Sequence, residues 1–401
     1  MSSYHQFYKD LDRRAKALFP SLKSARDVEW DMLISPLELK LPLAVRNGAE
    51  NAVRALHSLS RRPAYQAALE PVPGISDVPV KNRSLLMAYD FHSNEDGECF
   101  LVEVNTNASG FMLGSLMEMT HGDVAAADYE PLRALREAFA EELKLGGLDG
   151  SKAHIAISDE EIEQQKMYPE FLMYRDWLGS GGWTSELCES RALTVAGDRL
   201  TTATGRAVDL VYNRLTDFYF EDPAYAGLKE SYVRGLASIS PNPREYWLLA
   251  DKQRLIQWAD PTFMESTGAS DEEKAAIQAV VIPTFDKTHF GSVDQIWAER
   301  KNLFFKPKRS FGGKSVYRGE SVSRKVFERL MLEDILIQRY QPAQRMPTDD
   351  PRSVLSNWKF DLRFYVYGDA VQLCVARIYQ GQVTNFSSPM GGFTLVRFTG
   401  R

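Results

Sequence analysis

The chain has 401 residues, of which 44% are hydrophobic and 25% are charged. This balance is typical of globular proteins and, at this length, predicts two or three packed units. It excludes a disordered, fibrous or disulfide-stapled chain. The net charge of −6 gives no electrostatic reason to expect a nucleic-acid partner. No apolar run approaches the roughly 18 residues that span a bilayer, and the N-terminus lacks the pattern of a signal peptide, so we expect no membrane partner.

The cysteines also bear on the compartment. Cys99, Cys188 and Cys374 lie far apart in apolar stretches, and their spacing fits no metal site. This pattern favours reduced core residues in a cytoplasmic protein.

The first 150 residues are expected to combine helices with one β-hairpin. The first 85 residues have mainly helical spacing. Beyond them, two short apolar runs flank Asn94-Glu95-Asp96-Gly97, which is a strong turn sequence and predicts a hairpin. The expected elements are helices at 44–59 and 125–145, strands at 85–91 and 98–104, and a glycine-rich linker at 146–150.

Two further units are expected after the linker. Alternating strands and helices over 151–248 predict a small Rossmann-like α/β unit. A third unit, 249–401, begins with helices and continues with apolar strands around a glycine loop. The expected strands are 154–157, 183–188, 192–195, 208–212, 303–305, 335–340, 360–367 and 371–379, and the expected helices are 159–178, 251–258, 271–280 and 322–332.

The glycine loop at 306–315, with the sequence KPKRSFGGKS, ends like a Walker A motif but does not match it. Lys308 stands where the motif requires its first glycine, and the residues after Ser315 predict a strand instead of a helix. A cationic loop between two strands can still fold over a triphosphate, with Lys306 and Lys308 as counter-charge. A solvated basic hairpin is the alternative.

The predicted hairpin carries a set of oxygen-bearing side chains. Glu103 and Asn105 stand at i and i+2, hence on one face of a strand, and a turn centred between Asp96 and Gly97 places Asp90 opposite Glu103. Two facing carboxylates repel each other and destabilise the hairpin. Mg²⁺ prefers such oxygen ligands, and when bound it would make the arrangement favourable. The alternative is a solvent-facing acidic hairpin.

These pieces resemble the ATP-grasp ligases. The resemblance is carried by sequence segments at 251–252, 306–313, 335–340, 361–363, 376–381 and 385–392. Such ligases normally end with an Asp strand and a Glu-x-Asn strand, whereas here Asp90 and Glu103-Val104-Asn105-Thr106 come early. The order resembles a circularly permuted ATP-grasp domain, similar to eukaryotic-type glutathione synthetase and the glutathionylspermidine-synthase-like group. That fold is α/β (α+β), with the Rossmann-like unit serving substrate binding and the hairpin completing the ATP-grasp domain.

The resemblance implies roles for particular residues. Mg²⁺, as one or two ions, would be held by Asp90, Glu103 and Asn105. ATP, the co-substrate, would be bound by Lys252, Lys306, Lys308, Gly312, Gly313, Gln338, Arg339 and Tyr340. Arg377 and Arg363 would be catalytic, and the substrate would meet Arg214, Asn385, Ser387 and Ser388. Ser310 departs from the family, which has a metal-binding Glu there.

Several of these assignments have structural alternatives. Gln338 to Tyr340, the predicted adenine hinge, also fit a plain core strand. Arg363 could simply pair with Asp361, Arg377 could form a salt bridge within the sheet, and Arg214 could form a structural ion pair.

The implied activity is an ATP-dependent carboxylate–amine ligase that forms an acyl phosphate and releases ADP and phosphate. Its substrates would be an amino acid, a small peptide or a small amine, none of which the sequence names. A small-molecule kinase on the same fold and a catalytically inactive ATP-binding relative are the alternatives. Synthetases of this kind are often homodimers, and the oligomeric state stays open.

Overall fold

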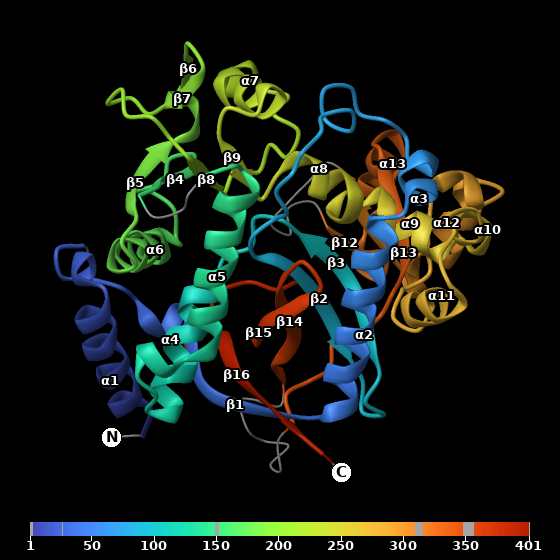
Figure 1. Cartoon of the computed structure of the whole chain (residues 1–401). Helices are drawn as coiled ribbons and strands as arrows, with labels where there is room; N and C mark the ends of the chain where they lie inside the picture. Colours follow the sequence, from blue (N-terminus) through green and yellow to red (C-terminus); the bar gives the residue numbers. More distant parts are fainter. Residues whose placement is uncertain (1–2, 26, 149–151, 309–315, 348–356, 401) are drawn as a thin grey trace.

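The computed structural model describes residues 3–25, 27–148, 152–308, 316–347 and 357–400. Gly312, Gly313 and Ser310 of the glycine loop lie outside these ranges. The protein is a mixed α/β structure built on three main sheets (Figure 1). No helix in the described ranges is both long enough and apolar enough to cross a membrane.

The largest sheet joins the beginning and the end of the chain. Its six strands lie in the order β1 (Ile34–Pro42), β16 (Gly392–Thr399), β15 (Ala370–Tyr379), β14 (Lys359–Tyr367), β2 (Met87–Ser93) and β3 (Cys99–Asn105). β1 runs parallel to β16, and every other neighbouring pair is antiparallel. The predicted hairpin is therefore present as β2 and β3, and it extends a sheet made of C-terminal strands.

The two faces of this sheet pack against different helices. Leu362, Phe364 and Val366 of β14 belong to the hydrophobic cluster that contains α2 (Leu43–Ser60), whereas Tyr365 belongs to the cluster of α4 (Phe111–Gly122) and α5 (Glu130–Leu145). Because side chains alternate along a strand, Asp361 and Arg363 share the face of Tyr365. The polar residues of β14 thus lie on the α4 side.

The first 85 residues are mainly helical, as predicted, but they also contain the strand β1, which was not predicted. Residues 37–41 alternate as Leu-Glu-Leu-Lys-Leu, and the side chains of Leu39 and Leu41 are buried while Glu38 is partly covered and Lys40 is exposed. This period of two is the pattern of a half-buried strand, and pairing with β16 gives it a place in the sheet.

The register of the hairpin agrees with the prediction at Asp90 and Glu103. Asp90 pairs with Glu103, and Tyr89 with Val104. Nearer the turn, however, Phe91 pairs with Leu101 instead of Val102, so the register shifts between Asp90 and Phe91. The pairing nearer the turn is one residue away from the predicted register, and Val102 is an extra, unpaired residue of the β-bulge kind. This extra residue compensates for the shift, so that Asp90 and Glu103 still face each other.

A four-stranded parallel sheet forms the second unit, as the alternating pattern predicted. Its order is β5 (Thr184–Glu189), β4 (His154–Asp159), β8 (Leu210–Asn213) and β9 (Ser238–Ser240). The predicted helix at 159–178 begins later, as α6 (Tyr168–Ser180), with Pro169 in its first turn. The segment before α6 is irregular and passes over the carboxyl ends of β4 and β8.

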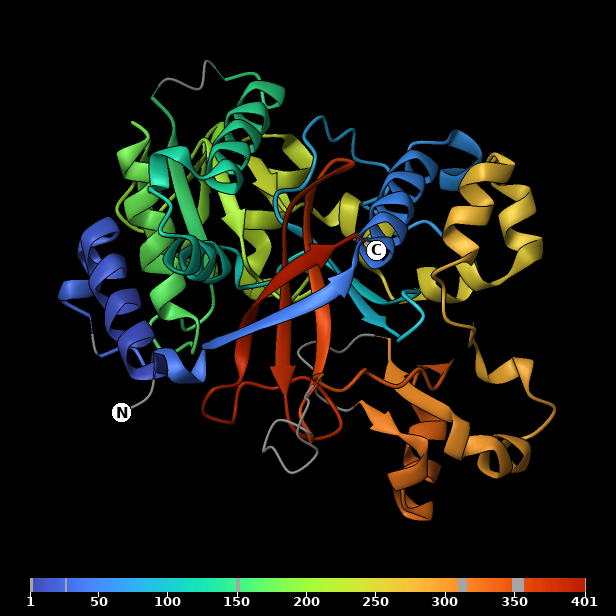
Figure 2. The same cartoon turned by 90° about the horizontal axis from the view of Figure 1, so that it is seen from below.

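The third sheet belongs to a smaller lobe with a hydrophobic core of its own (Figure 2). Its order is β10 (Thr284–Phe285), β13 (Ile335–Arg339), β11 (Leu303–Pro307) and β12 (Tyr317–Arg318), and α12 (Val293–Glu299) and α13 (Arg324–Leu332) pack on it. The remaining helices and strands are α1 (Ser3–Leu18), α3 (Pro63–Ala68), β6 (Thr194–Ala196), β7 (Arg199–Thr201), α7 (Ala226–Arg234), α8 (Pro243–Glu245), α9 (Gln253–Ala259), α10 (Pro261–Ser266) and α11 (Asp271–Gln278).

Candidate active site

A cavity of about 1130 Å³ lies where the three sheets meet. It is bounded by the α4-side face of the large sheet, by β11 and β13 of the smaller lobe, and by the carboxyl ends of β4 and β8. Most of the predicted site residues line it, although they come from distant parts of the sequence: Asp90, Glu103, Asn105, Arg214, Lys252, Lys306, Gln338, Arg339, Tyr340, Arg363, Arg377, Asn385 and Ser387. Lys308 and Ser388 are not among the lining residues.

Charged side chains of the large sheet form a connected row along one wall. Arg363 donates from Nε and Nη2 to the two carboxylate oxygens of Asp90, each at 2.7 Å. Arg377 donates from Nη2 to Asp90 Oδ2 at 3.0 Å and from Nε to Asp361 Oδ1 at 2.7 Å. The alternative that Arg363 pairs with Asp361 is therefore wrong, because Arg363 faces Asp90 across β14 and β2 and Arg377 faces Asp361 across β15 and β14.

This row is almost completely removed from solvent. The side chains of Asp90 and Asp361 are 2% and 5% exposed, and that of Arg377 is 11% exposed. Burial alone would raise the pKa of the Asp90 carboxyl, but the guanidiniums of Arg363 and Arg377 outweigh it and hold that pKa below its ordinary value. The carboxylate is therefore ionised at neutral pH.

Glu103 and Asn105 differ from Asp90 because each has a side-chain oxygen that accepts no hydrogen bond from the described residues. Asn105 Nδ2 donates to Glu103 Oε1 at 3.2 Å and to Asp90 Oδ2 at 3.1 Å. Glu103 Oε2 and Asn105 Oδ1 accept no hydrogen bond from any residue that the structure describes, and both side chains are partly exposed at the cavity. The described residues hold no cluster of three or more His, Cys, Asp and Glu side chains that would form a metal cage. A carboxylate and an amide oxygen nevertheless fit Mg²⁺ whose other ligands are phosphates and water.

Lys306 projects from β11 into the cavity beside this pair. Its Nζ donates to Gln338 Oε1 at 2.9 Å and to the carbonyl of the irregular residue Val102 at 3.2 Å. Burial lowers the pKa of Lys306 to about 8, with Lys252 acting in the same direction and Glu103 and Asp90 opposing it. A buried ammonium with two neutral partners is a cation ready to meet an anionic ligand.

Three of the predicted ATP-binding residues make other contacts. Lys308 Nζ lies 2.8 Å from Asp286 and 3.0 Å from Asp334, and these ion pairs hold it outside the cavity. The backbone N–H groups of Arg339 and Tyr340 donate to Pro283 O at 2.8 Å and Asn302 O at 2.9 Å. Neither of these two amides is left to donate to a base, so the predicted adenine hinge finds no support in them.

Arg214 follows β8 and binds the chain itself. It donates from Nη1 to Ala108 O at 2.7 Å and to Tyr212 Oη at 3.1 Å, and from Nη2 to Ser109 Oγ. The partners are neutral acceptors, so these contacts are not the ion pair of the structural alternative, and the clamp on a substrate carboxylate stays a prediction. Arg214 thereby fixes the loop that follows Asn105.

Glu170, which sequence reasoning missed, holds the end of the same loop. Its carboxylate accepts the N–H groups of Gly110, at 2.8 and 2.9 Å, and Met112, at 3.1 Å. Gly110 has a φ of 112°, and a Cβ there would lie 2.0 Å from Phe393, so only glycine fits. Burial raises the pKa of Glu170, whereas Arg214 and the backbone donors lower it. The sequence signal that could have identified Glu170 is its position as the one carboxylate within the apolar stretch 168–173.

The segment after β15 closes another side of the cavity. Thr384 Oγ1 donates to Asp361 Oδ2, and Lys166, from the segment before α6, donates to Phe386 O. Asn385 uses its side-chain amide on Gln380 O at 2.7 Å, within the segment. Asp159, at the end of β4, also lines the cavity, and burial raises its pKa to about 6.

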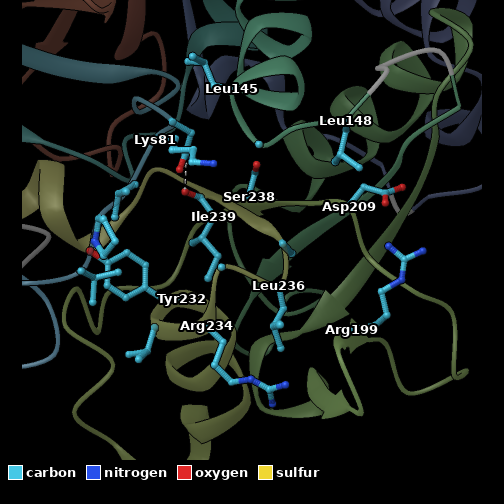
Figure 3. A pocket seen from close by; sticks show the side chains of 18 residues that line it. Lys81, Leu145, Leu148, Arg199, Asp209, Tyr232, Arg234, Leu236, Ser238 and Ile239 are labelled. Atoms are coloured by element: carbon cyan, nitrogen blue, oxygen red, sulfur yellow. Dashed lines mark hydrogen bonds between the residues drawn. The ribbon is translucent and has the colours of Figure 1, made fainter.

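A second cavity, of about 330 Å³, lies at the amino ends of β8 and β9, and none of the predicted site residues lines it. Figure 3 shows Lys81 on one side of it and Asp209 with Arg199 on the other. Lys81 and Arg199 are exposed, and neither has an ion-pair partner among the residues that the structure describes.

Comparison with known proteins gives a likeness of fold. No family model matches the sequence, and neither does any curated protein. Among solved structures, the chain is similar to a glutathione synthetase-like effector from Globodera pallida in its apo form, with a TM-score of 0.58 and 12% identity over 100% of this chain and 98% of that chain. A putative γ-glutamylcysteine synthetase from Methylobacillus flagellatus is similar over 79% of this chain and 81% of its own, with a TM-score of 0.46 and 10% identity. The likeness to the effector confirms the predicted resemblance to glutathione synthetase, and the chain has a glutathione synthetase-like fold.

Proposed function

We propose that the protein is an ATP-dependent ligase that joins a carboxylate to an amine through an acyl phosphate. The observation that carries this proposal is the composition of one cavity, which combines Lys252 and Lys306 with the pair Glu103 and Asn105 and with the buried row of Arg363 and Arg377. Phosphoryl transfer depends on positioning and charge neutralisation, and these residues can supply both.

The proposed reaction begins with attack of a substrate carboxylate oxygen on the γ-phosphorus of ATP. The bond to the β–γ bridging oxygen breaks, ADP leaves, and an acyl phosphate remains. The nitrogen of an amine then attacks the carbonyl carbon, phosphate leaves, and the nitrogen loses a proton to give the amide. Phosphorylation is needed because an unmodified carboxylate would have to expel oxide.

Each group in the cavity has a part in this scheme. Lys306 and Lys252 bind the ATP phosphates, and Glu103 and Asn105 would hold magnesium, which would supply charge neutralisation for the phosphates. Arg377 donates toward the transferred phosphoryl group. The absence of a nucleophile paired with a base among these residues is compatible with the scheme, because no covalent enzyme intermediate is required.

We also propose that the ATP-grasp domain is circularly permuted. The strand β2, which carries Asp90, pairs with β14, and β3, which carries Glu103, pairs with β2, although more than 250 residues of sequence separate this hairpin from β14. Permutation places the hairpin of β2 and β3 ahead of the rest and leaves the sheet order intact. The likeness of fold to a glutathione synthetase-like effector supports an amino acid or a small peptide as substrate.

The test follows ADP and phosphate from Mg-ATP in the presence of pooled amino acids, amines and γ-glutamyl peptides, with mass spectrometry of the pools. We expect equal ADP and phosphate, and a product lighter than its two substrates by one water. The Glu103→Gln variant should lose this activity, and Glu98→Gln, on the same hairpin but at the exposed turn, should retain it. ADP without phosphate would identify a kinase instead, and no turnover would contradict the ligase.

A further inference from the structure

Asp90 stands among the expected metal ligands, yet its surroundings are unlike those of Glu103. Its two oxygens accept four hydrogen bonds: two from Arg363, one from Arg377 and one from Asn105, at 2.7 to 3.1 Å. An ionised carboxylate offers about four lone-pair sites. Three of these bonds fall on Oδ2 and one on Oδ1, so Oδ2 is fully engaged and the one acceptor site left is on Oδ1, beside Arg363 Nε.

The space around Asp90 is equally unsuited to a metal ion. The residue is 1% exposed, whereas protein-bound Mg²⁺ usually keeps several water molecules in a near-octahedral shell. Two guanidiniums lie within hydrogen-bonding distance of the carboxylate, and each would repel a divalent cation placed there. The facing carboxylates of Asp90 and Glu103 are compensated on the Asp90 side by arginine.

The same contacts give Asp90 a different task. Arg377 is held by two carboxylates, through Nε to Asp361 and through Nη2 to Asp90. Its remaining terminal nitrogen, Nη1, has no partner among the residues that the structure describes, and the side chain lines the cavity. A guanidinium is planar, so fixing Nε and Nη2 also fixes the direction of Nη1.

We propose that Asp90 is a positioning residue that orients Arg377 and Arg363, and that magnesium is held by Glu103 and Asn105 without it. This assignment rests on the proposed function. Its consequence is that Asp90 acts on the rate of phosphoryl transfer through a preoriented donor, while leaving metal affinity to its neighbour on β3. Asparagine at position 90 would keep the shape but turn one acceptor oxygen into an N–H donor facing the arginines.

The test compares Asp90→Asn with Glu103→Gln in two measurements, using Glu98→Gln as the control. The first is the binding of Mn²⁺ with a non-hydrolysable ATP analogue, followed by the electron paramagnetic resonance signal of free Mn²⁺. The second is kcat and KM in the ligase assay. For Asp90→Asn we expect an unchanged Mn²⁺ affinity, within about twofold, and a kcat lower by about 100-fold. For Glu103→Gln we expect Mn²⁺ affinity to fall by about tenfold or more.

The outcomes separate this assignment from the proposed function. A loss of Mn²⁺ affinity in Asp90→Asn equal to that in Glu103→Gln would overturn the assignment while leaving the ligase intact. A wild-type protein that binds no Mn²⁺ with the nucleotide would contradict both.

A second measurement covers the case in which Asp90→Asn does not fold. The wild-type protein is labelled with ¹³C at the aspartate or the glutamate side-chain carboxyl, loaded with Mn²⁺ and the analogue, and examined by electron–nuclear double resonance. We expect a ligand-range ¹³C coupling with labelled glutamate and none with labelled aspartate. A ligand-range coupling from aspartate would contradict the assignment.

Discussion

The two cavities of this protein contain similar kinds of charged residue but arrange them differently. In the larger one, Asp90 and Arg363 are buried, Arg377 is nearly so, and the three are hydrogen-bonded across three strands of one sheet. In the smaller one, Lys81 and Arg199 are exposed, and Arg234 pairs with Glu230, one turn earlier on its own helix. Burying a charge costs free energy unless it is paired and hydrogen-bonded. Because the larger cavity contains buried charges in spite of this cost, we infer that it is the functional site.

The position of each cavity agrees with this contrast. The larger cavity lies over the carboxyl ends of β4 and β8, where open parallel sheets bind their ligands. The smaller one lies at the amino ends of β8 and β9. The predictions below test the contrast, from the largest expected effect to the smallest.

Replacing Arg377 should give the largest loss. Arg377→Gln removes the donor that faces the cavity and leaves Asp361 and Asp90 with one partner fewer, so we expect kcat to fall by about 1000-fold. The assay is ADP release at saturating Mg-ATP, with circular dichroism to check that the variant is folded. A variant that retains more than a tenth of the activity would contradict the role of Arg377.

Lys306 should give ATP binding a particular pH dependence. Its pKa is lowered by burial to about 8, so the side chain is charged below that pH and becomes neutral above it. Since a neutral amine attracts phosphate less, the Kd for ATP should rise by up to about tenfold per pH unit above 8. Calorimetric titration between pH 6.5 and 9.5 measures this change.

The matched variant for that measurement is Lys306→Arg. A guanidinium stays charged throughout this range, so the rise in Kd should disappear even if affinity changes overall. An unchanged pH profile in Lys306→Arg would show that another group titrates.

Removal of Glu170 should act mainly on stability. Glu170→Ala leaves the N–H groups of Gly110 and Met112 without their acceptor in a buried site, and we expect a loss of about 3 kcal/mol in the free energy of unfolding. Urea denaturation measures it. Glu163→Ala, an exposed position in the same part of the chain, should change stability by less than about 0.5 kcal/mol. An equal loss of stability in the two variants would contradict the role of Glu170 in holding the loop.

The smaller cavity should respond least. Arg199→Ala removes an exposed guanidinium at its rim, so stability should stay within about 0.5 kcal/mol of wild type and ligase activity should be unchanged. Both are measured as above. A large fall in activity would break the contrast between the cavities.

The sequence predicts the local secondary structure of this protein better than it predicts which side chains pair with each other. The hairpin of β2 and β3, the parallel strands of the second unit and the facing pair of Asp90 and Glu103 follow from periodicity and turn residues. The partners of Arg363 and Arg377 do not, because which carboxylate lies beside a guanidinium depends on strands that are far apart in the sequence. The same applies to Glu170, because its donors, the N–H groups of Gly110 and Met112, follow the distant strand β3.

Errors near the N-terminus have a related cause. The strand β1 has alternating leucines, but Pro36 and Pro42 argue against a strand locally, and pairing with β16 at the edge of the sheet tolerates them. Edge positions are where proline is least costly. Local propensity therefore missed a strand that the rest of the sheet requires.

The acyl phosphate is the centre of the account, and an isotope experiment tests it most directly. Pooled amino acids and γ-glutamyl peptides with ¹⁸O in their carboxylates are incubated with amines, Mg-ATP and the protein, and the phosphate released is analysed by mass spectrometry. The account predicts one ¹⁸O atom in each phosphate, because a carboxylate oxygen attacks phosphorus and leaves with it. Phosphate that carries no ¹⁸O would mean that water attacks ATP, and would contradict the proposed ligase.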